Sequence, residues 1–123
     1  EVVHVQHIPA GEGIGYGSTY ITPEPMTIAT IPVGYADGYP RSLSNRGTVL
    51  IHGTRCPVVG RICMDQFMVS VPDTITVKPG DKVVLLGSQG HESISALEIA
   101  ALASTIPYEI FCGFSERVPR QYI

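Results

Sequence analysis

Tyr16 is the residue whose surroundings most clearly suggest chemistry. It lies between Gly15 and Gly17, in a segment where glycine occupies every second position from 11 to 17. Because glycine has no side chain, these neighbours cannot shield the phenol, and a ligand or another chain can approach the backbone closely. A flexible surface loop is the simpler interpretation of the glycines. The placement of Tyr16 between them favours a tyrosine that is presented to a partner.

Two further tyrosines and one carboxylate have unusual surroundings for core residues. Tyr35 lies in the turn-like segment GYADG, and Tyr108 directly follows a proline. A buried tyrosine ordinarily keeps its ring in the core and its hydroxyl on a partner, and this interpretation is retained for Tyr39 and Tyr122. Asp65 interrupts an apolar stretch, which usually indicates the tip of a turn and less often a functional site. A turn beside a ligand would satisfy both interpretations of Asp65.

The composition argues against several classes of function. The net charge is −3, and the eight lysines and arginines are spread thinly, so a nucleic-acid-binding surface is not expected. The alternating glycines do not form a G-x-G-x-x-G dinucleotide motif, and no Walker-type lysine follows them. Three cysteines without C-x-x-C spacing and four histidines predict neither a disulfide framework nor a metal centre. Reduced cysteines suit the cytoplasm, and no apolar run is long enough to span a membrane.

The elements that must position these residues are mainly strands. The length suits one domain, residues 1–123, with a core of its own. Short β-branched or apolar runs between turn residues predict strands at 2–7, 27–33, 48–51, 56–64, 67–71, 83–86 and 117–123. One helix is predicted at about 95–105, where Ser95 and Glu98 form a capping-box pattern. The predicted fold is therefore mainly β, a barrel or sandwich with one α-helix.

Four sequence blocks together resemble a known family. They are GYGSTY at 15–20, IPVGYADG at 31–38, VVGRICMDQ at 58–66, and PYEI with RVPR at 107–110 and 117–120. Each block alone is weak, but their order and spacing over nearly the whole chain closely resemble the C-terminal domain of bacterial alanine racemases. The resemblance implies a mainly β, barrel-like domain, in agreement with the strands expected from the sequence.

The resemblance implies a catalytic role for Tyr16. This residue matches the tyrosine that is one of two opposed bases in a racemase dependent on pyridoxal phosphate, a cofactor that stabilises the substrate carbanion. Tyr16 would remove the α-proton of L-alanine, and a lysine would serve the opposite face. A phenol with a pKa of about 10 is a poor base at neutral pH unless a cation or donor stabilises the phenolate. No cation is adjacent to Tyr16 in the sequence, so the expected partner comes from elsewhere.

The resemblance also implies roles in binding. Met64 matches the position whose backbone N–H holds the substrate carboxylate, so its placement matters more than its side chain. Tyr35 and Tyr108 match tyrosines that narrow the entrance and favour a small amino acid, and Asp65 is expected to fix the turn beside Met64. An exposed apolar patch is expected around Tyr16, Tyr35 and Met64. Cys63 and Arg61 are expected to support the site without contacting the substrate directly.

Other parts of the implied active site lie outside this sequence. In the family, an N-terminal (β/α)₈ barrel carries the cofactor lysine, and the catalytic tyrosine reaches the barrel of the second subunit of a homodimer. Lys78 and Lys82 flank a turn and are expected to be exposed, so neither suits the cofactor. The chain begins without Met, so we expect a piece of a longer cytoplasmic enzyme that makes D-alanine for peptidoglycan. By itself the piece is expected to be inactive.

Two other functions remain compatible with the sequence. Related racemases act on serine or lysine, and one C-terminal domain does not settle the substrate. A free-standing β-barrel interaction module could also keep the motifs as scaffold. Such a module, however, gives no reason for Tyr16, Tyr35 and Met64 to occur together.

Overall fold

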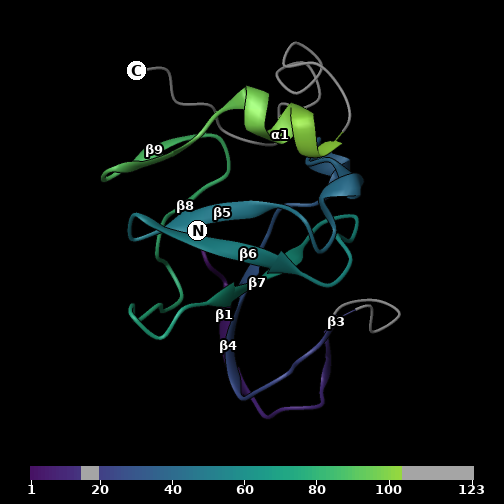
Figure 1. The fold of residues 1–123 in the computed structure, drawn as a ribbon, viewed down its shortest axis with the longest axis vertical. Helices are drawn as coiled ribbons and strands as arrows, with labels where there is room; N and C mark the ends of the chain where they lie inside the picture. Colours follow the sequence, from purple (N-terminus) through teal and green to yellow (C-terminus); the bar gives the residue numbers. More distant parts are fainter. Residues whose placement is uncertain (15–19, 104–123) are drawn as a thin grey trace.

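A computed structural model describes residues 1–14 and 20–103 of the chain. Within these residues the main element is a six-stranded sheet in the order β1-β4-β7-β6-β5-β8 (Figure 1). All neighbouring strands are antiparallel. The strands in chain order are β1 His4–Ile8, β4 Met26–Ile31, β5 Thr48–Ile51, β6 Thr54–Val59, β7 Phe67–Val71 and β8 Val83–Val84.

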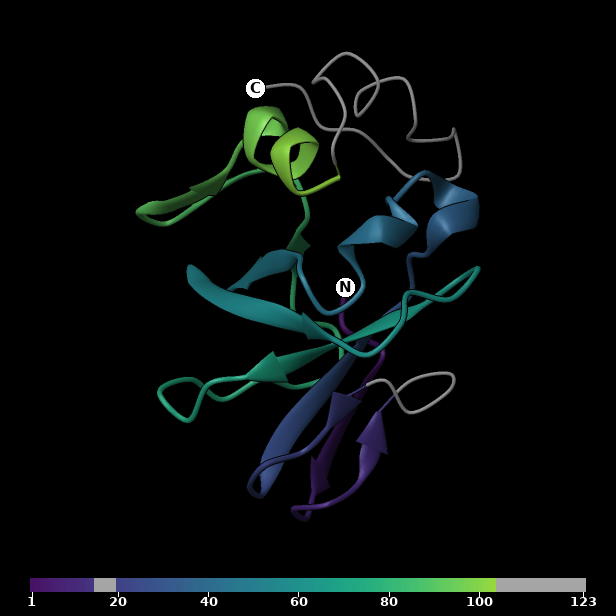
Figure 2. The same cartoon turned by 45° about the vertical axis from the view of Figure 1, so that its right-hand side comes forward.

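One small hairpin lies at one end of the sheet, and a second hairpin and one helix lie at the other end. Strands β2 (Gly13–Ile14) and β3 (Tyr20–Ile21) pair near the far ends of β1 and β4, at the bottom of Figure 2. Strands β9 (Gly87–Gln89) and β10 (Glu92–Ile94) pair at the other end, directly before helix α1 (Ala96–Ala103). No helix in the described part of the chain has the length and apolarity needed to cross a membrane.

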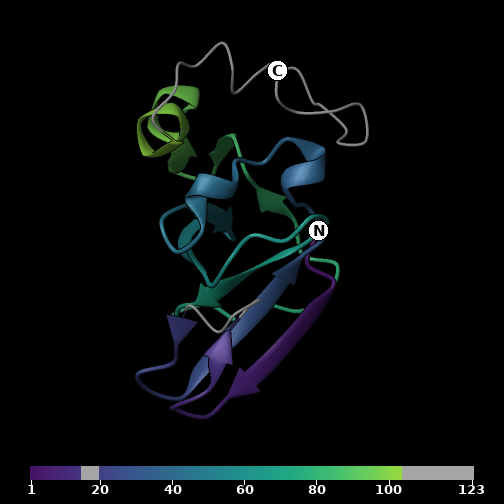
Figure 3. The same cartoon turned by 90° about the vertical axis from the view of Figure 1, so that its right-hand side faces the viewer.

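Two short 3₁₀ turns connect β4 to β5 on the same end of the molecule as α1 (Figure 3). The first, η2, spans Tyr35–Asp37, and the second, η3, spans Arg41–Leu43. Helix α1 packs against η3. Tyr39, between the two turns, is buried in the core and stacks on Phe67 with ring centroids 4.8 Å apart. This contact anchors the η2–η3 segment on the sheet.

Helix α1 is held in place by the apolar core around β5. Val49, Leu50 and Ile51 of β5 are all fully buried, so this strand is covered on both faces. Helix α1 supplies Ile99 and Ala100 to the same apolar cluster. Burying a side chain of this size stabilises the fold by roughly 1.5–3 kcal/mol. The helix is therefore held by tertiary packing, as is usual for an eight-residue element.

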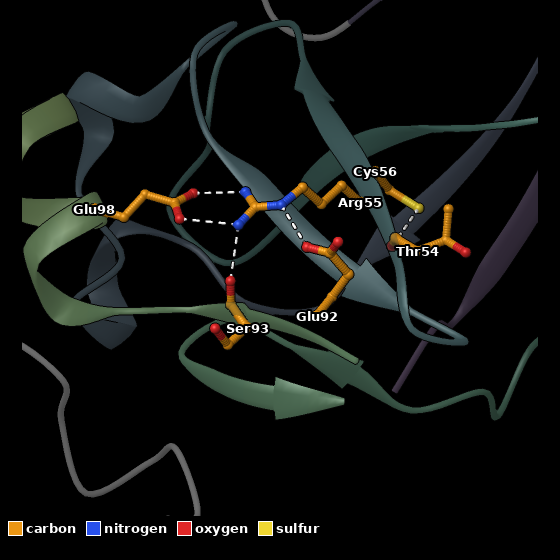
Figure 4. Close-up of polar contacts among 6 residues, drawn as sticks. All are labelled: Thr54, Arg55, Cys56, Glu92, Ser93 and Glu98. Carbon is orange, nitrogen blue, oxygen red and sulfur yellow. Dashed lines mark hydrogen bonds and ion pairs between the residues drawn. The ribbon is translucent and has the colours of Figure 1, made fainter. Parts of the chain in front are cut away.

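Arg55 makes the principal polar link between the sheet and the α1 unit, which consists of the β9–β10 hairpin and helix α1 (Figure 4). Its guanidinium, projecting from β6, donates to both carboxylate oxygens of Glu98 at 2.8 and 3.0 Å. It also donates to Glu92 at 2.9 Å and to the carbonyl oxygen of Ser93 at 2.8 Å. One side chain therefore ties both the hairpin and the helix to the sheet.

The mainly β fold with one helix is confirmed, and the bounds of β5 and β7 are those predicted. The helix begins as expected, because Ser95 Oγ accepts the Glu98 N–H at 3.0 Å. The second half of the capping box was wrong. The Glu98 carboxylate binds Arg55 rather than reaching back to the helix N-terminus. The strand expected at 117–123 lies outside the described residues.

The strand expected at 56–64 was wrong beyond Val59, and the error matters for the site. Gly60 has a left-handed φ of 80°, and its N–H donates to the side-chain oxygen of Asn45 at 2.6 Å. The chain therefore leaves the sheet at Gly60. Residues 61–66 form an irregular loop that crosses to the η2 turn instead of continuing β6.

Three other predicted strands differ at their ends. The strand expected at 27–33 ends at Ile31, because Pro32 has no N–H for the ladder. The strand expected at 83–86 pairs only over Val83–Val84. The strand expected at 2–7 begins at His4, since Val2 donates instead to the carbonyl oxygen of Asp81.

Candidate functional site

Tyr35 and Met64, which are distant in sequence, are brought together by two backbone hydrogen bonds. The Tyr35 N–H donates to the carbonyl oxygen of Cys63 at 3.1 Å, and the Ala36 N–H donates to that of Met64 at 2.9 Å. Both Tyr35 and Met64 are exposed, at 44% and 56% of their maximum. The η2 turn and the 61–66 loop therefore present an aromatic and a thioether side chain on one surface.

Gly34 makes this approach possible. A Cβ atom on Gly34 would collide with the carbonyl oxygen of Cys63 and with the carbonyl group of Met64, so no larger residue fits without moving one backbone. The same Gly34 donates its N–H to Asp37 Oδ2 at 3.1 Å. The Asp37 side chain is buried, at 4% exposure. Together they hold the η2 turn closed against the loop.

Sequence reasoning missed both of these residues, because the segment was interpreted only as turn chemistry. One signal was present. An aspartate three positions after Gly34 matches the capping-box spacing, in which a side chain at the third helical position reaches back to the N-cap amide. The close approach of Gly34 to Cys63 has no sequence signal, because it depends on where the 61–66 loop leaves the sheet.

The loop around Met64 is held by backbone bonds. The Cys63 N–H donates to the carbonyl oxygen of Gln66 at 2.9 Å, closing a bend at Met64 and Asp65. Asp65 is exposed at this bend, as expected for a turn tip, but its carboxylate has no hydrogen-bond partner among the described residues. The expectation that Asp65 fixes the turn stays a prediction.

The Met64 N–H has no acceptor within residues 1–14 and 20–103. It belongs to the same peptide group as the Cys63 carbonyl, which receives the Tyr35 N–H. In a trans peptide the C=O and N–H bonds point in opposite directions. The Met64 N–H therefore points away from the η2 turn, where it can serve an external acceptor.

Two arginines line a surface pocket at this point. Arg41 and Arg61 border it together with Tyr35, Cys63 and Met64. The Arg41 guanidinium lies 5.3 Å from the centroid of the Tyr35 ring, within the range of a cation–π contact. The pocket thus combines two positive charges with exposed apolar surface, which suits a small anionic ligand.

Two buried groups are unsuitable as acids or bases near neutral pH. Burial raises the pKa of the Tyr39 hydroxyl far above its ordinary value, and the nearby Glu98 charge raises it further. Burial also raises the pKa of the Cys56 thiol to about 11. Both groups therefore act in packing, as predicted for Tyr39. Cys63 is only half-buried and lies in the wall of the pocket.

The described residues do not fit a covalently held cofactor or a metal ion. Lys78 and Lys82 are the only lysines of the chain, and both are exposed on the surface rather than desolvated in a pocket. Within the described ranges, no three histidine, cysteine, aspartate or glutamate side chains cluster as metal ligands would. A cofactor such as pyridoxal phosphate would have to be held by other residues.

Two predicted site residues lie outside the described part of the chain. Tyr16 lies between the ends of β2 and β3 in the sequence, and Tyr108 lies five residues after the end of α1. The structure brings together Tyr35, Met64, Cys63 and Arg61, and adds to them Gly34, Asp37 and Arg41.

Comparison with known proteins gives the family. Residues 1–122 match the family described as the C-terminal domain of alanine racemase. The chain belongs to this family. The alanine racemase of Symbiobacterium thermophilum is 62% identical over 118 residues, which cover 96% of this chain and 31% of that protein.

Solved alanine racemases share the fold. The crystal structure of the enzyme from E. faecalis superposes with a TM-score of 0.91 at 46% identity, over 99% of this chain and 32% of that one. The enzyme from Bartonella henselae, with covalently bound pyridoxal phosphate, superposes with a TM-score of 0.87 at 41% identity, over 99% of this chain and 33% of that one. The chain thus spans about a third of the length of these alanine racemases.

Proposed function

We propose that this chain is the C-terminal part of an alanine racemase and contributes half of its active site. The identity of 62% to an alanine racemase over nearly the whole chain carries the proposal. The site also supports it: an exposed tyrosine, an amide without an acceptor among the described residues, and two arginines share one small surface. A carboxylate is the ligand group that this combination suits best.

Each residue then has a distinct task on the substrate. The Met64 N–H donates a hydrogen bond to the alanine carboxylate, and Arg41 and Arg61 attract that charge to the entrance. Tyr35, with Tyr108, narrows the passage so that a methyl side chain fits better than a longer one. Tyr16 removes a proton from Cα of L-alanine and returns one in the reverse direction.

The remaining groups must come from outside the described residues. Pyridoxal phosphate, which the Bartonella henselae enzyme carries covalently, supplies an electron sink for the carbanion. The exposed positions of Lys78 and Lys82 support a cofactor site elsewhere, on an N-terminal barrel. In a homodimer, Tyr16 of one subunit reaches the barrel of the other. The complete enzyme makes D-alanine for peptidoglycan in the cytoplasm, and residues 1–123 alone neither bind the cofactor nor racemise alanine.

The test compares the complete protein with its Tyr16→Phe variant, using Tyr20→Phe as a matched tyrosine in the same segment. We expect racemisation of L-alanine to fall roughly 10²–10⁴-fold in Tyr16→Phe, the contribution of a positioned acid or base, and to be nearly unchanged in Tyr20→Phe. Assays with L-serine and L-lysine separate the related substrates. An inactive wild-type protein, or a fully active Tyr16→Phe enzyme, would contradict the proposal.

A further inference from the structure

We propose that the turn from Gly34 to Asp37 positions the Met64 N–H for the substrate carboxylate, and that Gly34 and Asp37 set substrate affinity without touching the substrate. This inference rests on the proposed function and deepens it, because it names the residues that control its carboxylate site. The carrying observation is a pair of hydrogen bonds from the turn to two consecutive carbonyl groups, those of Cys63 and Met64.

The first bond orients the binding group. The Tyr35 N–H donates at 3.1 Å to the Cys63 carbonyl, which is the opposite end of the peptide group that carries the Met64 N–H. Because this peptide is rigid and planar, holding its oxygen fixes the direction of its hydrogen. A donor fixed before the ligand arrives costs less to organise on binding than one that must be ordered by the ligand.

The second bond prevents the loop from rotating about the first. The Ala36 N–H donates at 2.9 Å to the Met64 carbonyl, so the peptides on both sides of the Met64 Cα are held by the turn. Hydrogen bonding at the Cys63 oxygen also polarises that peptide, which strengthens its N–H as a donor. The turn therefore acts on both the direction and the strength of the Met64 amide.

Gly34 and Asp37 keep these two bonds in place. The missing side chain of Gly34 is what lets the turn reach the carbonyls of Cys63 and Met64. The buried Asp37 carboxylate accepts the Gly34 N–H at 3.1 Å, and the Asp37 N–H donates back to the Gly34 carbonyl at 3.0 Å. A side chain at Gly34 would displace the Cys63 and Met64 carbonyls, and a change at Asp37 would loosen the turn that bonds to them, so both are positioning residues.

The experiment uses the complete racemase and two halves of the substrate as probes. Propanoate is alanine without its amino group, and ethylamine is alanine without its carboxylate. In Gly34→Ala we expect the inhibition constant of propanoate and the KM of alanine to rise about 10-fold or more, as for a weakened hydrogen bond to a charged group. The inhibition constant of ethylamine should stay within about 2-fold, since one hydrogen bond to the carboxylate is all that changes.

Gly80→Ala is the matched control for loss of stability. Gly80 has a φ of 96° and open space where a Cβ would lie, so alanine there strains the backbone at a position that does not line the pocket. It should lower the melting temperature without changing propanoate binding. Asp37→Asn is the second variant, because it keeps an oxygen for the Gly34 N–H but removes the charge. We expect a smaller rise in the inhibition constant of propanoate. If Gly34→Ala does not fold, the result for Asp37→Asn tests the proposal.

The outcomes separate the two proposals. If the wild-type enzyme does not racemise alanine, the proposed function fails before any variant is compared. If it does, and folded Gly34→Ala and Asp37→Asn bind propanoate as the wild type does, only the positioning role is overturned. An equal loss of affinity for propanoate and ethylamine would also overturn it, because it would show general distortion of the site.

Discussion

The guanidinium of Arg41 lies over the aromatic ring of Tyr35, 5.3 Å from its centroid. Arg41 begins the η3 turn and Tyr35 begins η2, so the contact joins the two turns across the mouth of the pocket. Tyr35 is 44% exposed and would otherwise have several orientations available. The contact therefore restricts where the ring stands at the entrance.

Replacing Arg41 should loosen this ring and reduce the positive charge at the pocket. For Arg41→Met in the complete enzyme we expect kcat/KM for alanine to fall about 2–5-fold, the range of an exposed cation–π contact. The decrease should be larger at low salt, because screening weakens the attraction of a carboxylate to arginine. Steady-state kinetics at two salt concentrations measure both effects.

Arg46→Met is the control for this prediction. Arg46 is exposed on the adjacent turn and does not line the pocket. Its variant should keep the kinetics and salt dependence of the wild type. Equal losses in both variants would show that net charge, and not the contact with Tyr35, is responsible.

Removing Arg55 should detach the α1 unit from the sheet in part (Figure 4). Its guanidinium donates hydrogen bonds to Glu98, Glu92 and the Ser93 carbonyl. The side chains of the ion pairs are, however, 31–45% exposed. Solvent screening therefore limits the loss to about 1–2 kcal/mol for Arg55→Met. Thermal unfolding at pH 7 measures it as a decrease in melting temperature.

The acceptors of Arg55 provide a matched comparison. Glu98 accepts two of its hydrogen bonds and Glu92 accepts one, so Glu98→Gln should lower the melting temperature more than Glu92→Gln. The hydrogen bonds from Arg55 hold the pKa of Glu98 below its ordinary value of 4.5. This stabilisation is present above the unfolded pKa and is lost as the pH falls through the folded one. The difference between Arg55→Met and wild type should therefore shrink below about pH 4.5.

The sequence predicts the elements of this fold better than it predicts how two loops meet. The bounds of β5 and β7 follow from short apolar runs between turn residues, and the start of α1 after Ser95 follows from capping; both signals are local. The departure of the chain at Gly60 is not local, because it depends on a hydrogen bond to the distant side chain of Asn45. The same holds for Gly34, whose importance is set by the Cys63 and Met64 carbonyls. Periodicity reports which face a residue occupies, and not which backbone lies beside it.

Asp81 joins three segments of the chain. Its Oδ2 accepts the Lys78 N–H at 2.9 Å and lies 2.9 Å from His52 Nε2, while its carbonyl oxygen accepts the Val2 N–H at 2.8 Å.

These contacts should make the stability of the fold depend on pH in the acid range. The bond from the Lys78 N–H, followed by the bond and charge of His52, holds the pKa of Asp81 below its ordinary value of 3.8. A carboxyl with a lowered pKa stabilises the folded state above its unfolded pKa and loses that effect as the pH falls through the folded pKa. Asp81→Asn should therefore lower the melting temperature by a few degrees at pH 7. The difference from wild type should begin to shrink below the ordinary pKa and disappear only below the lowered pKa of the folded state. Asp73→Asn, at an exposed aspartate with no hydrogen-bond partner among the described residues, is the control and should track the wild type at every pH. A difference for Asp81→Asn that persists unchanged at low pH would show that the Lys78 and His52 contacts do not depend on the charge of the carboxylate.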